Sequence, residues 1–243
     1  QEQYKAQYAA GVQQQMAGMD ASQLAAALDG CTPDEMLPFY GDLAAIGTIA
    51  DIMLLEGENR RIVKAGLALL QQTERPGIAA LIEACGLGGK ELTAENVSFG
   101  LAPRLNAAGR MDSAAAALEL LLCEDPEEAE AIVAGLEAQN AARQKAEQDI
   151  LQGVLDSVAA DETYGADRIL VVWGRGYHQG VIGIVASRVV ERFGKPAIIV
   201  SVDENGEGKG SGRSIAGVSL YNAIAACSTS STATRATSRS SCG

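Results

Sequence analysis

Apolar side chains recur every three to four residues through much of residues 1–160, which predicts a mainly helical first part of the chain. At the start this spacing is carried by Tyr8, Val12, Met16 and Met19. Further helices are expected over residues 59–70, 76–85 and 113–122. Glycines and short polar segments separate these stretches, as is typical of helices joined by loops.

A long helix is expected from Pro126 to about Ala160, because proline is well placed in the first turn. Its middle, residues 137–149, is polar all round except for alanines. A helix without an apolar stripe usually bridges two bodies through solvent, so we predict a domain boundary within it. The alternative is a surface helix paired through its charges.

Residues 161–227 show short apolar runs between glycine-rich turns, which predicts a compact α/β unit. The runs at 168–173 and 197–202 are rich in β-branched residues and are expected to be buried strands. Apolar positions at helical spacing predict a helix over 180–193. An Asn-Gly pair at 205–206 predicts a hairpin turn that leads into a glycine-rich strand.

From Ser228 onward the chain is almost entirely Ser, Thr, Arg and Ala, so we predict a disordered tail. An out-of-frame, GC-rich coding sequence would give the same composition, and a frameshifted end is therefore expected. The predicted fold class is α/β, with a mostly helical part, a long connecting helix and a small α/β domain. The expected boundaries are residues 1–122, 123–160, 161–227 and 228–243.

Composition narrows the classes of partner. A formal net charge of −12 and a pI of about 4.6 argue against non-specific nucleic-acid binding by the chain as a whole. The five cysteines are scattered without metal-type spacing, which favours reduced thiols in the cytoplasm. No apolar run reaches membrane-spanning length, so we expect no membrane contact. Residue 1 is Gln, which predicts that the chain begins inside a longer protein.

Two glycine-rich stretches, each built around one arginine, carry the strongest chemical signal. The first, PRLNAAGRMD at 103–112, places Asn106 and Arg110 four residues apart, so a helical turn would put both on one face. An arginine fork beside small residues suits a phosphate or a nucleic-acid backbone. The alternative is a tight helix crossing in which Arg110 pairs with an acidic residue.

The second stretch, GKGSGRS at 208–214, combines backbone, hydroxyl and guanidinium donors. Gly212 permits close approach of the backbone, Ser211 offers a hydroxyl and Arg213 a bidentate fork. Together they suit a phosphodiester or a terminal phosphate. The alternative, which the residues alone weigh equally, is a glycine-rich edge strand with Arg213 in solvent.

Two further residues are candidates for chemistry. Asp51 lies within an apolar run, where a carboxylate must be paired, hydrogen-bonded or bound to a metal such as Mg²⁺ or Mn²⁺. A helix-capping aspartate is the alternative. His178 is the only histidine and lies in a polar loop between an expected strand and helix, where it either faces a ligand or is simply exposed. These two residues alone cannot build a two-metal site.

Four segments follow one another in the order LAAIGTIADIMLLEGENRRIV (43–63), APRLNAAGRMD (102–112), HQGVIGIVASRVVERFGKP (178–196) and GKGSGRSIAGVSL (208–220). Together they resemble the RecJ single-strand-specific DNA exonucleases of the DHH phosphoesterase superfamily. The resemblance covers about residues 43–226. It implies the helical end of a catalytic DHH domain, a connecting helix and a DHH-associated α/β domain.

The resemblance also implies roles for particular residues. Asp51 matches the last metal-binding aspartate of the family, whose Mn²⁺ or Mg²⁺ ions would activate a water for hydrolysis. Six residues match positions at which the family contacts its substrate: Asn106, Arg110, His178, Ser211, Gly212 and Arg213. The implied substrate is single-stranded DNA held near its 5′ end, and replication or repair proteins are expected partners.

The family pattern is incomplete in this chain. The earlier metal-binding aspartates, the Asp-His-His motif, the later Gly-Gly-His motif and the OB-type domain are all absent from the sequence. We therefore expect the C-terminal part of a metal-dependent 5′ to 3′ exonuclease of DNA repair and recombination, inactive by itself.

Other functions stay open on the sequence. One is a DHH-superfamily phosphodiesterase acting on short oligonucleotides or cyclic dinucleotides, and another is a non-catalytic module that binds single strands. A soluble α/β protein with purely structural glycine motifs is the least favoured.

Overall fold

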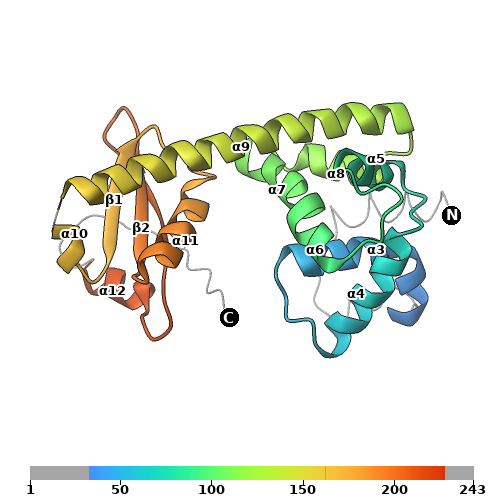
Figure 1. Ribbon diagram of the computed structural model, residues 1–243, viewed down its shortest axis with the longest axis horizontal. Helices are drawn as coiled ribbons and strands as arrows, with labels where there is room; N and C mark the ends of the chain where they lie inside the picture. The colour runs from blue at the N-terminus through green and yellow to red at the C-terminus, as the bar shows by residue number, and fades with distance from the viewer. Residues whose placement is uncertain (1–32, 162, 228–243) are drawn as a thin grey trace, which may run out of the picture. The chain divides into compact units, whose positions relative to one another are not determined.

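The computed structural model describes residues 33–161 and 163–227 (Figure 1). These residues divide into two compact units, one of residues 33–74 with 87–99 and the other of residues 75–86 with 100–227. The helix expected over residues 1–30 and the tail expected after Ser228 lie outside the described residues.

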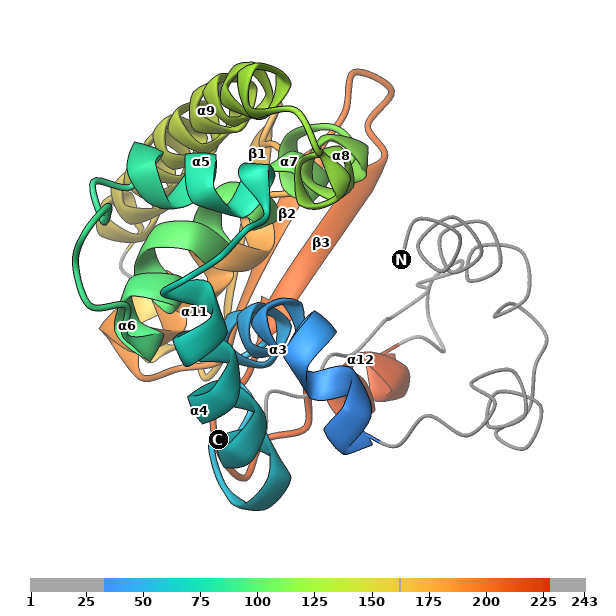
Figure 2. The same ribbon diagram turned by 90° about the vertical axis from the view of Figure 1, so that its right-hand side faces the viewer.

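The first unit is built on two packed helices, α3 (Pro33–Ala50) and α4 (Gly57–Leu70), which lie side by side in Figures 1 and 2. Their contact is close because Gly66 has no side chain, and a Cβ there would overlap the carbonyl oxygen of Gly41. The Gln71 amide then donates to the Lys90 carbonyl at 2.9 Å and fixes the following loop.

That loop leads into the short helix α6 (Ala94–Asn96), which continues directly into the π-helical turn η1 (Val97–Leu101). Thr93 is the N-cap, since its hydroxyl accepts from the Asn96 backbone at 3.2 Å while the Asn96 side chain accepts in return. The reciprocal bonds satisfy donors that a helix start leaves unpaired.

The second unit is organised along one long helix, α9 (Pro126–Ala160), which matches the span predicted from the sequence (Figure 1). Asp125 caps its start by accepting from the backbone of Glu127 and Glu128. Its first half packs against three shorter helices, and its second half against the sheet and α11 (Ile182–Phe193). The shorter helices are α5 (Pro76–Ala84), α7 (Ala102–Met111) and α8 (Ala115–Leu122).

The sequence predicted that the middle of α9 has no inward-facing stripe, but the structure shows one. Residues that are buried or half-buried recur at alternating steps of four and three: Ala129, Val133, Leu136, Asn140, Arg143, Glu147, Ile150 and Val154. The stripe therefore runs unbroken, and only its three central members are polar. Arg143 donates to Asn140 and to Glu147, so these buried groups satisfy one another.

A three-stranded sheet forms the other half of the second unit. Its order is β1 (Leu170–Arg175), β2 (Ala197–Val202) and β3 (Gly208–Arg213). The pair β1 and β2 is parallel and joined through α11, whereas β2 and β3 are antiparallel and joined by the expected hairpin. Two short helices accompany the sheet, α10 (Thr163–Ala166) and α12 (Leu220–Cys227). The predicted α/β class is confirmed.

Helices bury one face of the sheet much more than the other. One face, with Leu170, Val172 and Ile199, is buried against α9 and α11. On the other face β3 presents only glycines, and Trp173 of β1 is 62% exposed. The side chains that could bind a ligand through β3 are therefore those on the α11 side.

Cys85 follows α5 and is half-buried near the ion pair between Arg104 and Glu137. Burial raises the pKa of its thiol above the ordinary value; the Arg104 charge lowers that pKa and Glu137 raises it. Because the folded chain then holds the thiol proton more tightly than the unfolded chain, this contribution to stability is complete below the ordinary thiol pKa. It is lost as pH rises through the folded value.

We therefore predict that Cys85 of the native chain reacts with iodoacetamide at a pH midpoint above that of the urea-unfolded chain. Peptide mass spectrometry across a pH series measures both midpoints. A native midpoint equal to or below the unfolded one would contradict the burial effect, whereas a slower rate alone would report only restricted access.

Candidate nucleic-acid interface

In the glycine-rich strand β3, the glycines lie on one face of the sheet and the other three side chains on the opposite face. Lys209, Ser211 and Arg213 occupy alternate positions, so they share the face that α11 covers. A Cβ built on Gly183 of α11 would lie 3.0 Å from Ser211 Oγ and 3.3 Å from Arg213 Nη2. The missing side chain of Gly183 thus makes room for the hydroxyl and guanidinium of the strand.

The loop between β1 and α11 is held by the ring of Tyr177. The ring packs directly over Gly174, where any Cβ would overlap it, and the Tyr177 carbonyl accepts from Ser201 Oγ at 2.6 Å. Burial raises the pKa of the Tyr177 hydroxyl. His178 follows, and its Nδ1 accepts from the Gly180 backbone at 3.2 Å. The histidine therefore shapes the turn into α11.

Helix α7 contacts this turn through its C-terminal end. A Cβ on Gly180 would overlap the carbonyl oxygen of Arg110, and Arg110 Nη1 donates to the Gly180 carbonyl at 3.4 Å. Asn106 lies one turn earlier on α7, and both polar side chains are on exposed positions, as a helical turn requires. The motif of residues 103–112 is thus a helix that meets the loop before α11.

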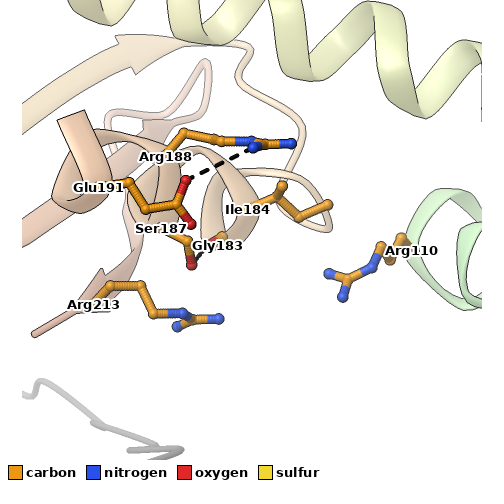
Figure 3. A pocket seen from close by; sticks show the side chains of 7 residues that line it. All are labelled: Arg110, Gly183, Ile184, Ser187, Arg188, Glu191 and Arg213. Atoms are coloured by element: carbon orange, nitrogen blue, oxygen red, sulfur yellow. Dashed lines mark hydrogen bonds and ion pairs between the residues drawn. The ribbon is translucent and has the colours of Figure 1, made fainter. Parts of the chain in front are cut away.

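These elements surround an open hollow of about 300 Å³ (Figure 3). Its lining residues come from α7, α11 and β3: Arg110, Gly183, Ile184, Ser187, Arg188, Glu191 and Arg213. Figure 3 shows the three arginine side chains reaching toward the same open space from different elements. Three guanidinium groups against one carboxylate give the hollow a net positive charge, although the chain as a whole is acidic.

The arginines of the hollow differ in how they are held. Arg213 Nη1 donates to the Gly212 carbonyl at 2.9 Å, and within the part of the chain that is described it makes no ion pair. Arg188 pairs with Glu147 at 3.2 Å and with Glu191 at 3.7 Å. Arg213 therefore keeps its charge for a ligand, while Arg188 shares its charge with two carboxylates.

The structure brings together two of the predicted site residues, Arg110 and Arg213, in the lining of one hollow. Ser211 and Gly212 precede Arg213 on β3, and Ser211 Oγ borders the same glycine of α11. His178 supports the adjoining turn and is not part of the lining. Asn106 is exposed on α7 without lining the hollow.

Asp51 belongs to the first unit, immediately after α3 ends at Ala50. The sequence predicted a carboxylate in apolar surroundings, but Asp51 is exposed because the chain turns away from the helix there. Ile52 takes a left-handed backbone, φ 55°, and is 87% exposed. Within the described ranges no three His, Cys, Asp or Glu side chains converge, so the residues present do not make a metal site.

The family-like segment of residues 178–196 contains α11, but the sequence assigned a substrate contact there only to His178 and not to the α11 residues that line the hollow. Gly183, Ser187 and Glu191 are four residues apart, as are Ile184 and Arg188, so they form one half-buried to exposed face of a helix whose other face is core. A polar face on an amphipathic helix is ordinary, and only the neighbouring arginines of α7 and β3 make it informative.

Comparison with known proteins agrees with this architecture. Residues 166–232 match the family model described as "DHHA1 domain". RecJ of Bacillus subtilis strain 168, a single-stranded-DNA-specific exonuclease, is 44% identical over 209 residues, which are 85% of this chain and 26% of that protein. The chain is a homologue of one part of RecJ.

Two further RecJ relatives show the same relation. The RecJ of Thermus thermophilus is 42% identical over 76% of the chain and 26% of its own length. The RecJ of Escherichia coli strain K12 is 37% identical over 75% of the chain and 32% of its length. This RecJ homologue therefore spans about a quarter to a third of the length of the curated relatives it matches.

Solved RecJ structures also share the fold. The T. thermophilus RecJ crystallised with Mn²⁺ superposes with a TM-score of 0.71 at 38% identity, over 85% of this chain and 29% of that one. The same protein crystallised with Mg²⁺ gives 0.71. An exonuclease RecJ bound to manganese gives 0.68 at 40% identity, over 83% of this chain and 48% of the other. In residues 33–161 and 163–227 no helix is both long and apolar enough to cross a bilayer.

Proposed function

We propose that the hollow lined by α7, α11 and β3 holds the sugar-phosphate backbone of single-stranded DNA within a RecJ-type exonuclease. The observation that carries the proposal is the meeting of Arg110, Arg188 and Arg213, from three separate elements, around one open hollow. Guanidinium forks bind phosphate oxygens in a bidentate manner, and such contacts fix a strand without reading its bases.

Each predicted residue has a role in this proposal. Arg213 and Ser211 donate to a phosphate near the 5′ end, and the Gly212 carbonyl helps to orient the guanidinium by accepting from Arg213 Nη1. Arg110 and Asn106 contact the strand from the exposed face of α7. His178 orders the turn into α11, with its Nδ1 committed to the Gly180 backbone. All of these contacts are made by the second unit.

RecJ relatives have been crystallised with Mn²⁺ and Mg²⁺, and we propose that the parent enzyme of this chain uses one of these ions for hydrolysis. Asp51 is the carboxylate that we assign to that site. The described residues do not complete it, so hydrolysis needs further metal ligands from outside them. We also propose that α9 connects the end of the catalytic domain to the DHHA1 domain, near residues 123–160.

The chain by itself is expected to lack nuclease activity. Incubating purified chain with a 5′-labelled single-stranded oligonucleotide and Mn²⁺ or Mg²⁺ should release no labelled product above a no-enzyme control. Metal-dependent cleavage by the chain, lost in Asp51→Ala, would contradict this expectation. Cleavage that persists in Asp51→Ala would indicate a contaminating nuclease.

Strand binding can be tested without catalysis. We expect the chain to bind a single-stranded oligonucleotide with a 5′-phosphate more tightly than the same strand with a 5′-hydroxyl, and both more tightly than a duplex. Fluorescence anisotropy at low salt measures all three. Equal affinity for the two 5′ ends would contradict the 5′-phosphate assignment, and tight binding of a dinucleotide alone would favour a short-oligonucleotide phosphodiesterase.

A further inference from the structure

We propose that Arg188, the third arginine of the hollow, is aimed at the phosphates by Glu147 of α9 and is partly neutralised by Glu191 until DNA binds. The inference rests on the proposed function, because it names a further contact and a regulating carboxylate at that same site. It assigns a role to Arg188 of α11, a residue for which the sequence motifs implied no contact.

Arg188 is anchored by a carboxylate of α9. Glu147 is only 14% exposed, and its two carboxylate oxygens accept separately, one from Arg143 Nη1 at 2.9 Å and the other from Arg188 Nε at 3.2 Å. Arg143 is itself fixed by two hydrogen bonds to the buried side chain of Asn140. The carboxylate is therefore held rigidly, and it orients a long side chain that would otherwise sample many rotamers.

Arg188 keeps donors that its two ion pairs do not use. A guanidinium has five N–H donors in a fixed fork. The ion pairs to Glu147 and Glu191 use Nε and Nη1, and no hydrogen bond of Nη2 to the described residues is present. The side chain is 56% exposed and lines the hollow, so the outer edge of the fork is presented to a ligand. Figure 3 shows it extending over Ile184 toward the space that Arg110 enters from the other side.

Arg188 and Arg213 lie at different positions along α11. The guanidinium of Arg213 borders Gly183, and Arg188 lies five residues later on α11. Five residues of α-helix advance about 7.5 Å along the axis. The two arginines are thus placed at different heights along the helix, where successive phosphates of one strand can each meet one of them.

Among the described residues, Glu191 is the one carboxylate in the lining of the hollow. Its ion pair with Arg188 is long, at 3.7 Å, and both side chains are largely exposed, so the pair contributes little stability. A carboxylate in the lining of a phosphate-binding hollow repels the ligand, and it also occupies part of the Arg188 fork. Glu191 therefore opposes strand binding, and a bound phosphate replaces it on Arg188.

The test compares single substitutions by affinity for a fluorescein-labelled single-stranded oligothymidylate across a salt series. Arg188→Gln should weaken binding several-fold and reduce the slope of log affinity against log salt by about 0.7, the loss of one phosphate contact. Glu191→Gln should tighten binding. Glu147→Gln should weaken binding, and should add little to the effect of Arg188→Gln because both act through the same side chain.

The matched control is Arg192→Gln, which removes the same charge from an exposed position of α11 outside the lining. Equal effects of Arg188→Gln and Arg192→Gln, or weaker binding in Glu191→Gln, would overturn the inference.

If Glu147→Gln fails to fold, Arg188→Lys replaces it, with an affinity expected between those of the wild type and Arg188→Gln. If Arg213→Ala loses affinity and Arg188→Gln has no effect, the inference about Arg188 is refuted while the proposed function stands. Absence of strand binding by the wild-type chain refutes the proposed function together with it.

Discussion

Replacing Arg213 by alanine is expected to weaken binding of a 5′-phosphorylated single strand by roughly 10- to 100-fold, the range for losing a charge-assisted hydrogen bond. The loss should be large because the guanidinium of Arg213 lies beside Gly183 and makes no ion pair with the described residues that would compete with a phosphate. The change should also abolish the preference for a 5′-phosphate over a 5′-hydroxyl. Anisotropy titrations of both strands measure the two effects together.

Arg175→Ala is the control for Arg213→Ala. Arg175 is an exposed arginine of the same sheet, two positions beyond Trp173 and therefore on the face turned away from α11. The substitution removes one positive charge and leaves the hollow intact, so affinity should fall only slightly through long-range electrostatics. Comparable losses in the two variants would mean that net charge, and not the hollow, governs binding.

Replacing Gly180 by alanine is expected to lower the free energy of unfolding by about 1–3 kcal/mol, the usual cost of overpacking. The added Cβ would overlap the Arg110 carbonyl oxygen, and a backbone atom of a helix cannot rotate away as a flexible side chain can. Because α7 or the loop must then move, strand affinity should fall as well. Chemical denaturation and anisotropy of the same preparation report both losses.

The same chemical change at Gly135 should have the opposite sign. Gly135 lies in the interior of α9, and apart from the adjoining backbone of its own helix no described atom comes within 4 Å of a Cβ built there. Alanine is the better helix former by about 0.5–1 kcal/mol, so Gly135→Ala should stabilise the chain and leave strand binding unchanged. Equal stability changes in the two variants would show that Gly180 is not a point of close contact.

Local chemistry made much of the fold predictable. The start of α9 follows from Asp125 and Pro126. Asp125 accepts from backbone N–H groups of the first turn, and Pro126 has no N–H to satisfy, so neither residue needs a partner from elsewhere in the chain. The strands β1 and β2 are short apolar, β-branched runs, and the Asn-Gly pair specifies the hairpin before β3. These signals are contained within a few consecutive residues.

The inward-facing stripe of α9 was not predictable in the same way. Asn140, Arg143 and Glu147 occupy its core-facing positions, and a hydropathy pattern reads them as solvent-facing. Their burial depends on mutual hydrogen bonds and on Arg188, which is 41 residues after Glu147. Such pairing depends on the folded backbone and leaves no periodic signal in the sequence.

The candidate site was only partly predictable for a related reason. Motif chemistry identified Arg110 and Arg213, and the structure places both around one hollow. Arg188, Ser187 and Glu191 lie on a helix face that looks ordinary until α7 and β3 are folded beside it. Asp51 was expected among apolar side chains, but its apolar neighbour Ile52 points to solvent with it.

The most direct test of strand binding in the hollow is an NMR titration that follows the Nε–Hε signals of individual arginines while a 5′-phosphorylated single strand is added. We predict that the signals of Arg110, Arg188 and Arg213 shift together and saturate at one concentration, while those of Arg175 and Arg192 stay unchanged. Uniform small shifts of all arginines, or shifts that spare Arg213, would contradict the assignment of this hollow as the strand-binding site.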